Sequence, residues 1–343
     1  MKLQHRAIIA LLAVGAACKP TEQRAAAGDT AQAGTQATAE ATAAAAPEPT
    51  PANPKGSEGW ELVTTVKGFD RPESVWYDST LDVYFVSNTG GSNGSDSHGY
   101  ISRVKSDGSI DSLRFITDAR NDITLRTPRG LAIVGDTLLT ADGKSLRAFD
   151  KHTGAGLGDV DLAQLGAELL NDVAPGSDGS ILVTDTRARD GAGAIFRVPT
   201  KGEGSARTPQ RVSTDATLGG PNGITWDRVR DHYLVASFLG NEIHSWMPGS
   251  DPKSLATGPG RFDGIAALGD GRILVTSWND SSLMVVRGDT VRTVISGLPH
   301  PADIGIDGRR QRVAIPLSAT NEVVIFTIPH ATAGREVPRK VTR

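Results

Sequence analysis

The sequence predicts an all-β fold, a six-bladed β-propeller of four-stranded antiparallel blades. One opening pattern recurs six times between residues 60 and 330, at spacings of 39 to 56 residues. Such spacings are near the length of a four-stranded propeller blade. No long stretch has a sustained helical period, and glycine is frequent, at 39 of 343 residues. This composition favours many short strands joined by tight turns.

Each repeat begins with a turn that leads into an apolar strand. The six openings read RPESVWYD, TPRGLAIV, LLNDVAPG, GPNGITWD, RFDGIAAL and HPADIGID. A second β-rich run follows each opening, and a third strand with alternating polarity comes next; in the first repeat these are VYFVSN and YISRVK. Fourth strands are weaker, as expected at an outer edge. A β-sandwich would not repeat one opening six times, and the units of a parallel solenoid are usually shorter.

Residues 61–67, ELVTTVK, match none of the inner strands. We expect this N-terminal segment to form the outer strand of the last blade. The two ends of the repeat region would then pair with each other and close the ring, which removes exposed sheet edges.

The N-terminal part of the chain predicts export. In residues 1–17, basic residues precede a short apolar run, and small residues lead to Cys18, the only cysteine. The run is too short to span a bilayer, and the position of Cys18 resembles the lipidated cysteine of a bacterial lipoprotein signal. We therefore expect a membrane-anchored lipoprotein on the periplasmic or cell-surface side, with Cys18 lipidated, or a secreted protein if Cys18 is not modified.

Composition predicts a disordered tether at residues 18–59, because this segment is rich in Ala, Thr and Pro and has almost nothing large to bury. A propeller is expected at residues 60–330 and a flexible tail at residues 331–343. The formal net charge is only −3, and no Lys/Arg run is present to neutralise phosphates, which argues against nucleic-acid binding. We expect a monomer that acts on a small molecule and contacts a membrane only through its lipid.

Equivalent residues in the six openings should form a ring at one mouth of the central channel, because each inner strand of a propeller starts there. Those residues are Glu73, Arg129, Asn171, Asn222, Asp263 and Ala302. Two carboxylates and two amides offer oxygen ligands only, which suits one hard divalent cation, most simply Ca²⁺. The alternative is that these are ordinary turn residues that cap local backbone groups.

The ordered motifs PES, ND, PNG and FDG resemble those of the SMP-30/gluconolactonase/luciferin-regenerating enzyme propellers, and more distantly the diisopropylfluorophosphatase and paraoxonase enzymes. The resemblance implies that Glu73, Asn171, Asn222 and Asp263 hold a catalytic Ca²⁺. It also implies cation-assisted hydrolysis of a lactone or ester, with Asp263 as base or nucleophile. One departure is Leu169, where gluconolactonase-type members carry an arginine that grips a sugar lactone.

Other residues are expected near this mouth by position. His300 is a candidate general base, although a lone histidine is often structural. The predicted substrate-lining residues are Arg129, Asn88, Asp142, Asp185 and Trp278. The alternative to an enzyme is a non-catalytic propeller in which the cation is structural and the rim binds a protein, glycan or small ligand.

Overall fold

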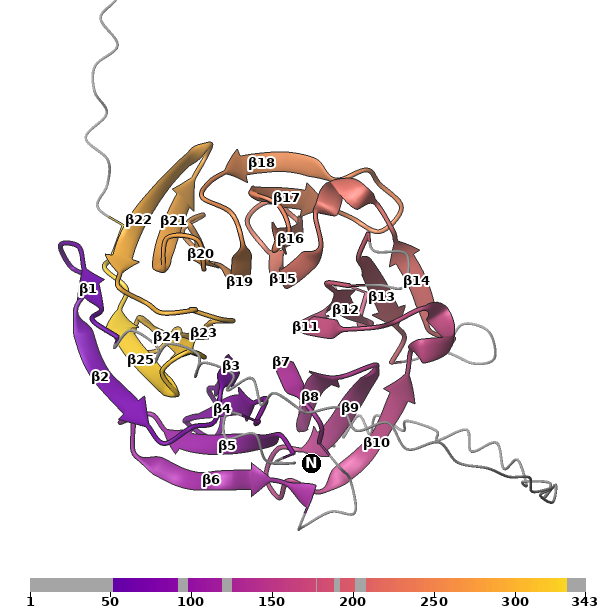
Figure 1. Ribbon diagram of the computed structural model, residues 1–343, viewed down its shortest axis with the longest axis horizontal. Helices are drawn as coiled ribbons and strands as arrows, with labels where there is room; N and C mark the ends of the chain where they lie inside the picture. Colours follow the sequence, from indigo (N-terminus) through magenta and orange to yellow (C-terminus); the bar gives the residue numbers. More distant parts are fainter. Residues whose placement is uncertain are drawn as a thin grey trace, which may run out of the picture.

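The computed structural model describes residues 52–91, 98–118, 125–176, 178–187, 192–200 and 208–331. It confirms the predicted six-bladed propeller of four-stranded antiparallel sheets, which are arranged around a central channel (Figure 1). The predicted export signal, the lipidation candidate Cys18 and the tail beyond residue 331 lie outside the described residues.

Each blade runs from an inner strand at the channel to an outer strand at the rim. Blade 1 consists of β3 (Pro72–Asp78), β4 (Val83–Asn88), β5 (Tyr100–Lys105) and β6 (Ile110–Ile116). Blade 2 consists of β7 (Pro128–Val134), β8 (Thr137–Asp142), β9 (Ser145–Asp150) and β10 (Gly156–Asp161). Blade 3 consists of β11 (Leu170–Pro175), β12 (Ile181–Asp185), β13 (Ala194–Val198) and β14 (Gln210–Ser213).

The remaining blades continue in chain order. Blade 4 consists of β15 (Pro221–Asp227), β16 (His232–Ser237), β17 (Glu242–Trp246) and β18 (Lys253–Thr257). Blade 5 consists of β19 (Phe262–Ala267), β20 (Ile273–Ser277), β21 (Ser282–Arg287) and β22 (Thr290–Ser296). Blade 6 consists of β23 (Gly305–Asp307), β24 (Arg312–Leu317), β25 (Glu322–Thr327) and β2 (Leu62–Lys67). Short 3₁₀ turns η1 (Ala163–Leu165) and η3 (Ala216–Leu218) precede blades 3 and 4.

The ring closes as predicted, because the N-terminal strand β2 pairs antiparallel with β25 of the last blade. A contact near the channel also joins the last blade to the first. The Asp303 backbone N–H donates to the Glu73 carbonyl at 2.9 Å. Backbone pairing therefore ties the N-terminal strand to the last blade at the rim and the last blade to the first at the channel.

The hydrophobic core is divided into six clusters, each between two neighbouring blades. The second strands β4, β8 and β12 are buried along their whole length, since both of their faces meet another blade. Outer strands such as β10 are mostly exposed, which explains their weak hydrophobic pattern. At the channel the blades approach so closely that a Cβ on Gly223 would lie 2.3 Å from the Asp263 carbonyl oxygen.

The predicted tether boundary at residue 59 needs correction. Residues 55–56 form β1 (Lys55–Gly56), which pairs with β22 as a fifth strand of blade 5. The Ser57 N–H also donates to the Val294 carbonyl at 2.7 Å. Backbone hydrogen bonds make this contact, and composition gives no signal for them.

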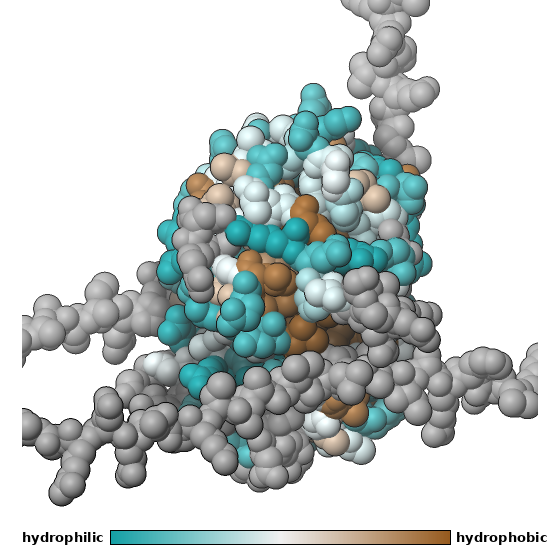
Figure 2. Space-filling model, turned by 90° about the vertical axis from the view of Figure 1, so that its right-hand side faces the viewer, coloured by the Kyte–Doolittle hydropathy of each residue, from teal (hydrophilic) through white to brown (hydrophobic). Residues whose placement is uncertain are grey.

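The side of the ring seen in Figure 2 presents hydrophilic residues around a smaller hydrophobic area. Within the described part of the chain, no helix has the length and apolar character needed to cross a bilayer.

Candidate metal and substrate site

Five of the six inner strands are irregular at the predicted ring position. In each, the pairing with the second strand shifts across one or two residues, and the shifts enclose Glu73, Arg129, Asn171, Asn222 and Asp263. A bulge of this kind redirects a side chain away from the alternation of a regular strand. The sixth ring residue, Ala302, precedes the short strand β23 and brings no functional group.

The four predicted ligands share an unusual property. Glu73, Asn171, Asn222 and Asp263 are buried, with exposed fractions of 5, 4, 3 and 3%. Each has one buried oxygen that finds no hydrogen-bond partner among the described residues, namely Glu73 Oε2 and the Oδ1 atoms of the other three. Nearly all buried polar atoms in folded proteins are paired. These oxygens do not cap the turn backbone, as the turn-residue alternative requires, and they fit a cation.

Arg129 brings a positive charge to the same ring. Its Nη1 lies 3.1 Å from Glu73 Oε1, and Glu73 Oε2 remains unpaired. The guanidinium therefore orients the carboxylate and leaves one oxygen for another ligand.

Burial and mutual repulsion govern the carboxylates. Burial raises the pKa of Glu73, against the lowering effect of Arg129. Burial also raises the pKa of Asp263 well above its usual value, and the charges of Glu73 and Asp303 add to this effect. Such groups are stabilised in their charged form when a cation offsets them.

The donor set selects the class of metal. Among the residues described, no group of three or more His, Cys, Asp or Glu side chains is arranged to hold a metal ion. The ring therefore depends on its two amide oxygens as well as on its two carboxylates. An all-oxygen set suits Ca²⁺ or a similar hard cation better than zinc or copper.

Two further buried aspartates lie next to the ring and were not predicted. Asp172 and Asp303 line a 190 Å³ cavity inside the channel. Asp172 Oδ2 accepts from the Ile224 N–H at 2.7 Å, and Asp303 Oδ2 accepts from Ser74 Oγ at 2.5 Å. Burial raises the pKa of Asp303 to about 7. Both side chains accept a hydrogen bond from a neighbouring blade, so they help to hold adjacent blades together.

Three predicted substrate-lining residues have a different role in the structure. Asn88, Asp142 and Asp185 end the second strands of blades 1 to 3 and are almost fully buried. Asn88 Oδ1 accepts from the Asp70 N–H, and Asp142 and Asp185 accept from two and three backbone N–H groups. They fasten the turn that enters the inner strand of their own blade. Their sequence positions predicted that these three side chains line the channel mouth. Their hydrogen bonds instead direct them into the turn.

Trp278 and His300 come together, although they belong to different blades. Their rings stack with centroids 4.2 Å apart and an interplanar angle of 3°. Trp278 is close enough to Asp263 to help lower the pKa of that carboxyl, against the larger raising effect of burial. Burial and then the charges of Arg261 and Arg71 lower the pKa of His300, so its imidazole is neutral at pH 7.

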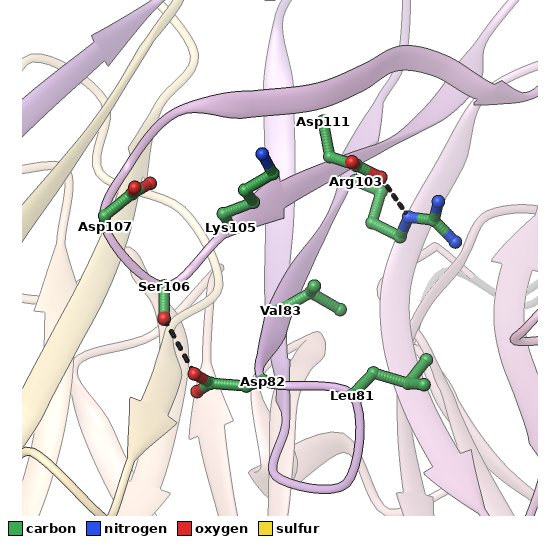
Figure 3. Close-up of a pocket in the computed structure, with 8 residues that line it drawn as sticks. All are labelled: Leu81, Asp82, Val83, Arg103, Lys105, Ser106, Asp107 and Asp111. Atoms are coloured by element: carbon green, nitrogen blue, oxygen red, sulfur yellow. Dashed lines mark hydrogen bonds and ion pairs between the residues drawn. The ribbon is translucent and has the colours of Figure 1, made fainter.

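A separate pocket of 430 Å³ lies in blade 1, where β4 and β6 begin and β5 ends (Figure 3). Glu73 lies at the other end of this blade. Several of its polar side chains are paired with each other. Arg103 Nε lies 2.6 Å from Asp111 Oδ2, and Ser106 Oγ donates to Asp82 Oδ2 at 3.0 Å. This pocket lacks the unpaired buried oxygens of the channel mouth, and we do not regard it as the site.

Comparison with solved structures finds the same propeller fold in other proteins. No protein-family model and no curated protein sequence matches the chain. A gluconolactonase from Xanthomonas campestris is similar in structure, with a TM-score of 0.59 and 17% identity over 82% of this chain and 98% of that one. The calcium-binding protein regucalcin from Agrobacterium tumefaciens gives a TM-score of 0.54 at 14% identity, over 79% of this chain and 94% of its own.

Virginiamycin B lyase from Staphylococcus aureus is similar as well, with a TM-score of 0.54 and 13% identity over 78% of this chain and 99% of that one. The shared feature is the six-bladed propeller predicted from the repeats. At these identities the likeness establishes the fold, and the function must be inferred from the site.

Proposed function

We propose that the protein is a Ca²⁺-dependent hydrolase of the SMP-30/gluconolactonase/luciferin-regenerating enzyme type, which acts on a small lactone or ester at the channel mouth. The observation that carries this proposal is the set of four buried, unpaired oxygens on four bulged inner strands. The similar folds of a gluconolactonase and of regucalcin support it.

Glu73, Asn171, Asn222 and Asp263 would hold the cation. When bound, a divalent cation polarises a carbonyl oxygen and stabilises the negative charge that develops on it. Arg129 keeps Glu73 in place through the 3.1 Å ion pair. Asp263, ionised once its charge is offset, serves as base or nucleophile rather than as acid.

His300 supplies a second proton acceptor at the mouth. Its imidazole is neutral at pH 7 and is held flat against Trp278. A neutral imidazole can take a proton from water and return it to a leaving group. Leu169 stands where gluconolactonase-type members carry a substrate-binding arginine, so the proposal does not specify a sugar lactone.

We further propose that the protein is exported and works as a monomer outside the cytoplasm, tethered through a lipid on Cys18. Metabolic labelling with a fatty acid tests the anchor. Loss of the label in Cys18→Ser would support lipidation, and an unlabelled wild-type chain would contradict it.

Calorimetric titration of the full chain with Ca²⁺, followed by a lactone and ester screen, tests the enzymatic proposal. We expect one site in the wild type and none in Glu73→Ala. Asp263→Asn should keep the fold and lower kcat by about 10²–10⁴-fold. Calcium binding without turnover of any substrate would favour the non-catalytic propeller, whereas full activity in Asp263→Asn would refute the role of Asp263.

A further inference from the structure

A second set of equivalent positions lies beside the metal ring. These positions lie two residues before each ring residue, where the chain leads into the inner strand. They are occupied by Arg71 in blade 1, Arg261 in blade 5 and His300 in blade 6. All three have left-handed backbone conformations, with φ of 53°, 48° and 48°. Blade 4 has Gly220 there, with φ of 66°. Bulky residues in this region are uncommon and concentrate at functional sites.

Arg71 and Arg261 have no carboxylate partner among the described residues, so their charges are available to a ligand. Both are exposed. Blades 5, 6 and 1 are consecutive in the ring, so the equivalent positions Arg261 and Arg71 lie on the two sides of His300. Both charges also contribute to the lowered pKa of that imidazole. Two unpaired guanidinium groups near one point form a site of positive potential.

An aromatic surface joins these charges to the ring. The Arg261 guanidinium lies 4.9 Å from the centre of the Phe238 ring and 5.3 Å from that of Trp278. Trp278 meets Phe238 edge to face at 5.2 Å and stacks on His300 on the other side. Trp278 Nε1 is buried, and Trp278 also lowers the pKa of Asp263, so this ring lies between the arginine and the metal ligands. Stacking fixes the direction of the Arg261 guanidinium, so less side-chain freedom is lost when it binds a ligand.

We propose that this part of the mouth is an anion subsite, in which Arg71 and Arg261 bind a carboxylate of the substrate and Trp278 with His300 packs against a planar part of it. Guanidinium groups suit carboxylates because their N–H donors match both oxygens. Resting on the proposed function, this inference narrows the substrate to a lactone or ester that carries a carboxylate. Asp263 is two residues from Arg261, so a substrate anion bound by this arginine would lie near the proposed metal ligands.

Binding of small aromatic probes tests the subsite without any need for turnover. Benzoate, its neutral isostere benzamide, and phenyl phosphate are titrated into the full chain, and tryptophan fluorescence is followed with and without Ca²⁺. We expect benzoate to bind at least about tenfold more tightly than benzamide, also in chelator, because a hydrogen bond to a charged group contributes about that factor. The preference should weaken as salt is raised.

Variants separate the subsite from other sources of the same signal. Arg71→Gln with Arg261→Gln should abolish the benzoate preference, and Arg71→Lys with Arg261→Lys should keep part of it. Arg228→Gln, at an exposed position far along blade 4, is the matched control. Equal binding of benzoate and benzamide, or a preference that survives the double Gln variant, would overturn the proposal. Binding of phenyl phosphate but not benzoate would overturn the carboxylate assignment.

The two proposals can fail separately. Selective benzoate binding in a chain that hydrolyses nothing would leave the anion subsite standing and remove the hydrolase. Hydrolysis of neutral lactones without benzoate selectivity would support the hydrolase and overturn the anion subsite. If both hold, kcat/KM should favour a carboxylate-bearing lactone over its amide, and the double Gln variant should lose this ratio mainly through KM.

Discussion

Replacing Glu73 by Gln should separate metal binding from folding. The side chain is 5% exposed, with one oxygen paired to Arg129 and the other free. Gln keeps an acceptor for Arg129 and removes a buried charge, so the stability of the cation-free protein should change by about 1 kcal/mol or less. The stabilisation of the folded protein by Ca²⁺ should fall much more, because the site loses a charged ligand.

The magnitude follows from linkage. At a Ca²⁺ concentration 100 times its Kd, binding stabilises the wild type by about 2.7 kcal/mol. For a domain of this size that corresponds to a rise in Tm of roughly 5–10 °C. If the substitution weakens binding by about 100-fold, the same Ca²⁺ concentration contributes only about 0.4 kcal/mol, or roughly 1–2 °C.

Thermal unfolding of both chains in chelator and in Ca²⁺ measures this difference. Glu58→Gln, which changes an exposed glutamate, is the matched control and should behave as the wild type. A full Ca²⁺-dependent rise in Tm in Glu73→Gln would refute the assignment of this carboxylate to the metal. A large fall in Tm in chelator alone would show that the ion pair with Arg129 is structural.

Three further predictions concern the scaffold. Gly223→Ala should lower the free energy of unfolding by about 1–3 kcal/mol or more, because its Cβ would lie 2.3 Å from a backbone oxygen of blade 5; Gly269→Ala, with open space around it, should not. Asp142→Ala should destabilise by about 2 kcal/mol, measured by urea unfolding, because two part-buried backbone N–H groups and the Arg147 guanidinium lose their acceptor; an effect on KM alone would restore its predicted substrate role. Asp82→Asn should cost about 1 kcal/mol at pH 7, since Arg310 lowers the pKa of that carboxyl. The deficit should shrink below about pH 4, where Asp82 of the unfolded wild type begins to bind a proton; a deficit that does not depend on pH would refute this explanation.

The sequence alone determined the repeat, the number of blades and the ring positions, because each blade must bury the same strands and turn at the same place. It also indicated the closing strand, since residues 61–67 fit no inner strand, and β2 pairs with β25. The four oxygen-bearing residues Glu73, Asn171, Asn222 and Asp263 could be predicted as one set, because equivalent positions of successive blades lie next to each other around the channel.

Only the tertiary structure decided which polar residues are free to act. Asp142, Asp185 and Asp263 were all expected at the channel mouth, yet two accept backbone N–H groups and the third keeps an unpaired oxygen. The stacking of Trp278 on His300, and the two arginines beside them, likewise depend on side-chain packing between blades. Repeat patterns fix where the backbone goes, whereas the hydrogen bonds of a side chain depend on neighbours distant in the sequence.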